Sequence, residues 1–137
     1  MAIWYLDTSA LAKLVRTERQ TRALRRWLRG KRWLLSDLHR TELRRAATRA
    51  GGSAPERAER LIAMSDVLRL TPEVFDRAGQ LGPPGLRSLE ALHLAAALTL
   101  GADLAGIVAY DDRLAAAALT TRIPVASPGA AKPSTIP

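Results

Sequence analysis

The sequence predicts an α/β fold, in which helices cover a central, mainly parallel sheet of five strands. Short apolar runs alternate with longer segments that carry apolar residues every three or four positions, which is typical of parallel strands joined by helices. The 137 residues fit a single domain, and a domain of this size buries roughly two-thirds of its unfolded surface. The chain has no cysteine, which excludes disulfides, thiolate zinc sites and cysteine nucleophiles.

The expected strands are the apolar runs at residues 3–6, 33–36, 67–70, 106–110 and 123–126. The expected helices lie at residues 8–16, 18–30, 37–50, 55–65, 72–82, 88–101 and 112–119. Local signals support several boundaries. Ser88 is placed to cap the N-terminus of the last long helix and Gly101 to end it. Gly51 and Gly52 separate two helices.

No internal repeat or linker divides the chain, so residues 1–128 are expected to form the domain. Residues 129–137 belong to a stretch rich in proline, glycine and alanine and are expected to form a flexible tail. Asp7 interrupts the first apolar run before the core of a signal peptide could form. The longest apolar stretch, 91–110, contains a histidine, an aspartate and two glycines. A cytoplasmic protein without a membrane span is therefore expected.

The chain is strongly basic, with a net charge of +8 and 18 arginines among its 21 basic residues. A basic excess favours a polyanionic partner through phosphate pairing and counterion release. Coding bias produces a similar composition, so charge alone leaves nucleic-acid binding open. Within the helix expected at 18–30, a spacing of three and four places several arginines on one face: Arg19, Arg22, Arg26 and Arg29. This face is either solvated or directed at a phosphate backbone or a protein partner.

Two aspartates directly follow expected strands. Asp7 ends the apolar run at 3–6, and Asp111 ends the run at 107–110. Ligands of an open parallel sheet bind beyond the carboxyl ends of its strands, so both carboxylates are expected at that rim. Each aspartate could instead cap the helix that follows it. We expect Asp111 to be a ligand, and the neighbouring Asp112 to be the cap or a group that supports the ligand.

Two glutamates interrupt the apolar faces of expected helices, and Glu42 is the first. It shares a helical row with Leu38 and Ala46, so its side chain is expected to point toward the interior or a cleft. An unpaired carboxylate is costly there, which favours a bound cation. The alternative is an intrahelical ion pair with Arg45.

Glu90 is the second glutamate that interrupts an apolar helix face, and it shares a helical row with Leu94 and Leu98. The alternative explanation is that its charge stabilises the first turn of the helix through the helix dipole. His93, one turn along, is expected to be a packed, hydrogen-bonded core residue rather than a ligand or base. His39 has no assigned role.

Carboxylates gathered in one place repel one another unless a cation lies between them. The set of Asp7, Glu42, Glu90 and Asp111 therefore predicts a metal-dependent enzyme. An all-oxygen ligand set without histidine or cysteine favours Mg²⁺ or Mn²⁺ over zinc.

Several motifs resemble those of the PIN-domain ribonucleases, in particular the VapC toxins of toxin–antitoxin pairs. The matching segments are Tyr5-Leu6-Asp7-Thr8-Ser9-Ala10-Leu11, Arg40-Thr41-Glu42-Leu43, residues 86–95, Tyr110-Asp111-Asp112-Arg113-Leu114 and residues 123–128. The resemblance covers nearly the whole chain in order and spacing, and the blocks around Asp7 and Asp111 are close matches. At Glu90 the family usually has aspartate, so this side chain is one methylene longer.

The resemblance implies a PIN-like three-layer α/β/α sandwich and Mg²⁺- or Mn²⁺-dependent hydrolysis of RNA phosphodiester bonds. It implies direct metal ligation by Asp7 and Asp111, and direct or water-bridged ligation by Glu90. Glu42 would orient the attacking water or hold a second metal.

The resemblance also suggests supporting residues and partners. Thr8 and Ser9 would hold the ligating carboxylates in place, as such ligands require, and Arg87 would meet a substrate phosphate. The family implies a homodimer and a cognate antitoxin protein, whose C-terminal arm occupies the active-site groove in a toxin–antitoxin hetero-oligomer.

One alternative stays open, a PIN-like module that binds RNA or protein but has a weakened catalytic site, which the glutamate at position 90 would permit. Two other classes fit less well. A phosphatase of the haloacid dehalogenase type needs a second acid two residues after Asp7, where this chain has Ser9. A response-regulator receiver needs a lysine at the end of a late strand, and none of the three lysines is so placed.

Overall fold

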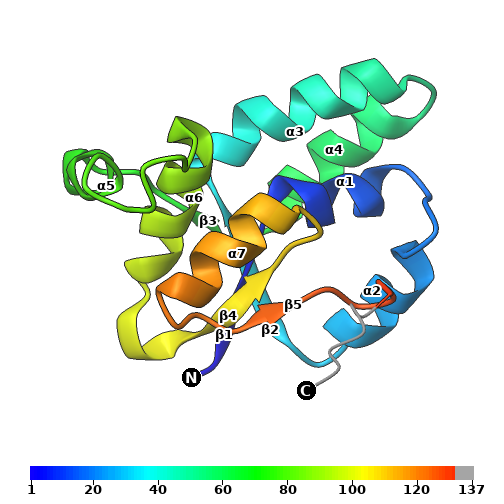
Figure 1. Cartoon of the computed structure of the whole chain (residues 1–137). Helices are drawn as coiled ribbons and strands as arrows, with labels where there is room; N and C mark the ends of the chain where they lie inside the picture. The colour runs from blue at the N-terminus through cyan, green and yellow to red at the C-terminus, as the bar shows by residue number, and fades with distance from the viewer. Residues whose placement is uncertain (132–137) are drawn as a thin grey trace.

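The computed structural model describes residues 1–131 and contains a five-stranded sheet with helices on both faces (Figure 1). The strands are β1 (Ile3–Leu6), β2 (Arg32–Ser36), β3 (Val67–Leu68), β4 (Leu104–Val108) and β5 (Val125–Ala126). Their order in the sheet is β3-β2-β1-β4-β5, and each of these pairings is parallel. The expected parallel sheet is confirmed, with β1 at its centre.

The helices lie where the periodicity places them, with shifts at their ends. They are α1 (Thr8–Val15), α2 (Thr21–Leu28), α3 (Asp37–Ala50), α4 (Ala54–Met64), α5 (Pro72–Ala78), α6 (Ser88–Leu98) and α7 (Asp112–Thr120). A short 3-10 turn, η1 (Gly101–Asp103), precedes β4. No helix within residues 1–131 is both long and apolar enough to cross a membrane.

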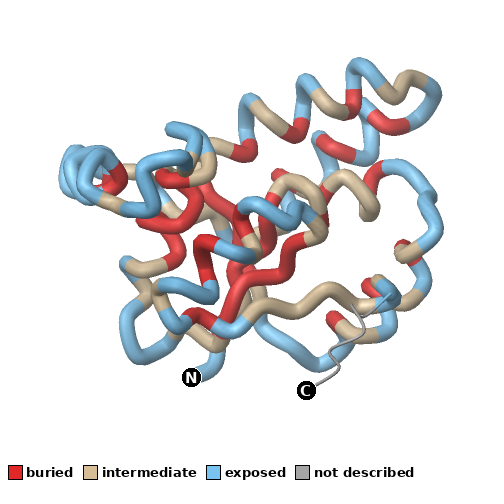
Figure 2. Tube along the Cα trace, viewed as in Figure 1, coloured by how far each residue is buried: buried red, intermediate tan, exposed pale blue. Residues whose placement is uncertain are grey.

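Alternation along the central strand divides the apolar residues between two cores. Ile3 and Tyr5 pack in one core with residues of α5, α6 and α7. Leu6 packs in the other core with residues of α1 to α4, and Trp4 borders it. Figure 2 shows buried residues along the strands and on the inward sides of the helices. The three-layer α/β/α sandwich is therefore confirmed.

Three segments end earlier or begin later than expected, two because of a local hydrogen bond and one because proline lacks an N–H. Helix α2 begins at Thr21, whose hydroxyl accepts from Glu18 N at 2.8 Å and donates to Lys13 O at 2.8 Å. Strand β3 stops at Leu68, and the N–H of Leu70 donates to the Asp37 carboxylate of α3 at 3.1 Å instead of to a strand. Strand β5 begins after Pro124, which has no N–H to donate.

Two expected caps are wrong by one or two residues. Arg87 takes the N-cap position of α6, so Ser88 is its first helical residue. The helix ends at Leu98 rather than at Gly101, and Gly101, with φ of +54°, opens the 3-10 turn instead. Most of the expected flexible tail, residues 132–137, lies outside the described residues.

Candidate active site

The predicted acids Asp7 and Asp111 lie just beyond the carboxyl ends of two neighbouring strands, β1 and β4. The N–H of Asp7 donates to Val108 O at 2.9 Å, so the chain leaves β1 still paired to β4. Both aspartates also cap helices: Asp7 accepts from Ser9 N at 3.2 Å, and Asp111 accepts from Arg113 N at 2.9 Å. Asp111 itself caps α7, so of the two roles expected for Asp112 the cap is wrong, and the supporting role stays a prediction.

Ser9 fixes the distance between the two strand ends. Its hydroxyl donates to Oδ2 of Asp7 at 2.6 Å and accepts from the N–H of Tyr110 at 2.9 Å. Tyr110 directly precedes Asp111, so one serine connects the two aspartate-bearing segments. Asp7 is 6% exposed, and its position is therefore set by these contacts rather than by solvent.

Glu42 reaches the same region from α3, which packs against α1. Its Oε1 accepts from the Thr8 hydroxyl at 3.2 Å and from Nε2 of His93. Among the described residues its hydrogen-bond partners are Thr8 and His93, and it makes no ion pair with Arg45, so that alternative is wrong. His93, 3% exposed, is the packed, hydrogen-bonded core histidine that the sequence predicts.

Glu90 lies at the first turn of α6 and faces α7. Its Oε1 accepts from Arg87 N at 3.0 Å, and its Oε2 lies 3.9 Å from Nε of Arg113. Because Arg113 also donates its backbone N–H to Asp111, it connects Glu90 with the end of β4. Arg87 is exposed, and its expected contact with a substrate phosphate stays a prediction.

The four acids share one arrangement that suits a hard cation. In each, one oxygen accepts a hydrogen bond from the protein. For three of them, Asp7, Glu42 and Asp111, the other oxygen has neither a hydrogen-bond nor an ion-pair partner within residues 1–131. Anchored carboxylates with a free oxygen are the ligands that Mg²⁺ and Mn²⁺ prefer, so the residues fit such an ion.

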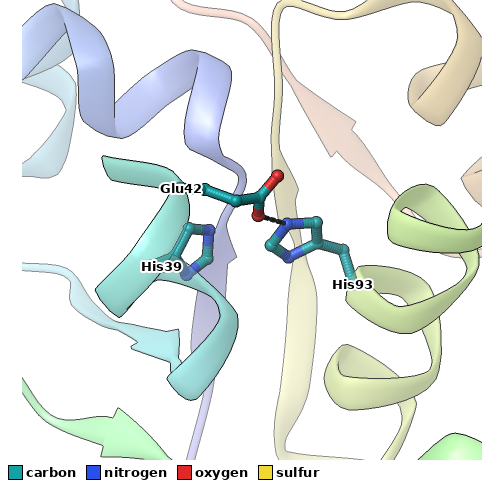
Figure 3. Close-up of side chains that lie close together, drawn as sticks. All are labelled: His39, Glu42 and His93. Atoms are coloured by element: carbon teal, nitrogen blue, oxygen red, sulfur yellow. Dashed lines mark hydrogen bonds and ion pairs between the residues drawn. The ribbon is translucent and has the colours of Figure 1, made fainter. Parts of the chain in front are cut away.

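The tightest group of possible ligands is a different one. Within the described part of the chain, His39, Glu42 and His93 bring ligand atoms within 4.8 Å of one another (Figure 3), whereas the four acids do not approach so closely. His39 is fully buried, and burial lowers its pKa well below 6.5, with a smaller effect from His93.

Sequence reasoning missed the part that Tyr5 and Ser36 play in this region. The Tyr5 hydroxyl lies 2.8 Å from Oγ of Ser36 and 2.6 Å from Nδ1 of His93. Burial raises the pKa of Tyr5 well above 10, and the nearby charges of Asp7 and Glu42 act in the same direction. The available signal was the position of Tyr5, two residues before a predicted ligand in a buried strand.

Comparison with known proteins agrees with this geometry. Residues 4–119 match the family model of the PIN domain. Ribonuclease VapC46 of Mycobacterium tuberculosis (strain ATCC 25618 / H37Rv) is 44% identical over 129 residues, covering 93% of this chain and 99% of that protein. Ribonuclease VapC47 of Mycobacterium tuberculosis (strain CDC 1551 / Oshkosh) is 42% identical over 134 residues, covering 93% and 98%. The chain therefore belongs to the PIN-domain family.

Proposed function

We propose that this protein is the toxin of a toxin–antitoxin pair and an endoribonuclease that hydrolyses RNA phosphodiester bonds with a divalent metal. The observation that carries the proposal is the set of anchored carboxylates beyond the carboxyl ends of β1 and β4, in a chain similar along nearly its whole length to ribonucleases named VapC.

We assign Asp7 and Asp111 as direct ligands of Mg²⁺ or Mn²⁺ and Glu90 as a direct or water-bridged ligand. Such an ion, when bound, supplies polarisation of the phosphate and a more acidic water. The protein supplies orientation: Ser9 holds Asp7, while the Arg113 N–H holds Asp111.

Glu42 is assigned to orient the attacking water or to hold a second metal. Its Oε1 is occupied by Thr8 and His93, so its second oxygen is the one that can accept a hydrogen bond from water. Thr8 therefore supports catalysis through Glu42 rather than by contact with the ion.

The test of the function is cleavage of a labelled RNA by the purified protein with Mg²⁺ or Mn²⁺. Discrete products of internal cleavage are expected. If the protein binds RNA or a protein partner but cleaves nothing at any concentration of either ion, the alternative of a catalytically weakened PIN-like module replaces this proposal.

Substitutions at Glu90 test whether a glutamate can act as a metal ligand where the family usually has aspartate. We expect Glu90→Asp to keep or raise the single-turnover rate, and Glu90→Gln to lose at least tenfold, ~1.4 kcal/mol of transition-state stabilisation. Glutamine can still accept from Arg87 N, so the helix cap survives. Glu73→Gln is the matched control, because Glu73 also lies in the first turn of a helix, α5. If Glu90→Gln cleaves like wild type, Glu90 is only a helix-end charge.

The basic residues expected on one helix face line a wide groove between α2 and α4. Its cavity has a volume of about 1570 Å³, and its wall includes Arg22, Arg26 and Arg29, with arginines of α4 opposite and Glu18 as its one acidic residue within the described part of the chain. The face is shorter than expected, because α2 spans only Thr21–Leu28. We propose that this groove binds RNA or the antitoxin. We also propose that the protein forms a homodimer within the toxin–antitoxin complex.

Reversing Arg22, Arg26 and Arg29 to glutamate is expected to weaken binding of RNA or of the antitoxin in a salt-dependent manner. For RNA, each lost phosphate contact should reduce the slope of log K against log salt by roughly 0.7 to 0.9. Reversal of Arg69, Arg77 and Arg122, exposed arginines outside this groove, is the charge-matched control. If the slope of log K against log salt is unchanged for both RNA and the antitoxin, the groove arginines form only a solvated surface.

A further inference from the structure

Four buried polar side chains lie behind the Glu42 carboxylate, and three of them, Ser36, Tyr5 and His93, connect to it through side-chain hydrogen bonds. Tyr5, Ser36 and His39 are fully buried, and His93 is nearly so. They come from β1, β2, α3 and α6, so the group joins elements that are far apart in the sequence. Buried polar groups are costly unless they are hydrogen-bonded, so their bonds indicate what each contributes.

The hydrogen bonds run in one direction through this group. Oγ of Ser36 accepts from the backbone N–H of His39, which leaves its own proton for Tyr5 Oη, 2.8 Å away. The Tyr5 hydroxyl lies 2.6 Å from Nδ1 of His93 and donates to it when the neutral ring carries its proton on Nε2. An ionised carboxylate has acceptor sites only, so the proton between His93 Nε2 and Oε1 of Glu42 belongs to Nε2. Each link leaves a donor for the next, and the last donor faces Glu42.

We propose that His93 is a positioning residue for cleavage, which holds Glu42 by one oxygen so that the other stays free to act. The proposal rests on the proposed ribonuclease function. Thr8 donates to the same Oε1, so two donors fix one oxygen. Figure 3 shows the second oxygen of Glu42 directed away from both histidines. Glu42 and Thr8 line a cleft of about 690 Å³, where a substrate or water can reach this carboxylate.

The same hydrogen bonds argue against a metal site made of His39, Glu42 and His93. Nδ1 of His39 accepts the N–H of Ser36 at 2.9 Å, so the proton of the neutral ring lies on Nε2. Nε2 is buried without a hydrogen-bond partner within residues 1–131, and in this tautomer it has no lone pair for a metal. His93 already uses both ring nitrogens, on Tyr5 and on Glu42.

The test compares two amide side chains of different reach. His93→Asn places an amide near the position of Nδ1, within reach of Tyr5 alone, whereas His93→Gln places one near Nε2, within reach of Glu42. In single-turnover RNA cleavage across Mg²⁺ concentrations, we expect His93→Asn to lose about tenfold or more and His93→Gln to stay within roughly threefold of wild type. A role in core packing alone predicts that each variant loses activity only in proportion to its fall in Tm, because asparagine leaves a larger cavity than glutamine.

His39→Gln is the matched control, because glutamine at this position can still accept from the N-cap N–H of Ser36. It is expected to cleave like wild type. Thermal unfolding with Zn²⁺ is measured beside cleavage. If His39→Gln loses as much activity as His93→Asn, and if Zn²⁺ raises the Tm of the wild-type protein but not of His39→Gln, a metal site made of histidines replaces the proposal.

A readout independent of cleavage separates this proposal from the proposed function. The rise in Tm that Mn²⁺ produces is expected to be smaller for His93→Asn than for His93→Gln. If the wild-type protein cleaves no RNA, the proposed function fails, and this difference still supports the positioning of Glu42. Equal rises in Tm together with equal cleavage rates for the two variants overturn the positioning role.

Discussion

Asp7→Asn is expected to lower RNA cleavage at least about a hundredfold, equivalent to ~2.7 kcal/mol of transition-state stabilisation, while the protein stays folded. Asparagine caps helices as well as aspartate does, so the bonds from Ser9 and the start of α1 should survive. What the substitution removes is one negative charge at the rim beyond β1. Because Asp7 is buried, replacing its charge by a neutral amide also removes a desolvation cost in the metal-free protein, so Tm should hold or rise.

The measurement is single-turnover cleavage beside thermal unfolding, with Asp111→Asn expected to behave in the same way. Asp76→Asn, an exposed aspartate on α5, is the matched control and should change neither rate nor Tm. If Asp7→Asn loses activity only in proportion to the fraction unfolded, the carboxylate is a helix cap and not a ligand.

The sequence was informative wherever one residue's position on an element decides its surroundings. The positions of Asp7 and Asp111 were predictable because a residue after a parallel strand must lie at the carboxyl edge of the sheet. Glu42 was found because its row on α3 is apolar. These are local properties, which periodicity and strand ends encode directly.

From the sequence, helix capping and metal ligation are alternatives for the same acid, but the two roles can coexist. Asp7, Asp111 and Glu90 each hold a helix end with one oxygen. A carboxylate has two oxygens, so a capping role and a ligating role are compatible in one residue. A cap that holds one oxygen fixes the orientation of the carboxylate, which is compatible with the proposed role as a ligand.

The hydrogen bonds behind Glu42 could not be predicted from the sequence. Tyr5 and His93 are 88 residues apart, and Glu42 and His93 are 51 apart. Their contact depends on how α3 and α6 pack against opposite faces of the sheet around the end of β1. No spacing rule relates residues on different helices, so this part of the site appears only when the elements are placed in space.

Removing divalent metal is expected to abolish cleavage, with a loss of at least about a thousandfold, ~4 kcal/mol, and restoration by Mg²⁺ or Mn²⁺. The chain has no cysteine, and within residues 1–131 His93 is hydrogen-bonded at both ring nitrogens while His39 is fully buried, so neither histidine is placed to replace the ion.

The measurement is cleavage in excess chelator, with chelator already saturated by Mg²⁺ as the control. An ion that binds only the folded state adds stability by mass action, about 2.7 kcal/mol at a hundred times its Kd, so chelation should also lower Tm. Asp7→Asn should lose most of this metal-dependent rise while matching or exceeding the wild-type Tm in chelator, because one buried charge is gone. Full activity in excess chelator would exclude the metal-dependent mechanism, and the carboxylates would then have to act as acids and bases alone.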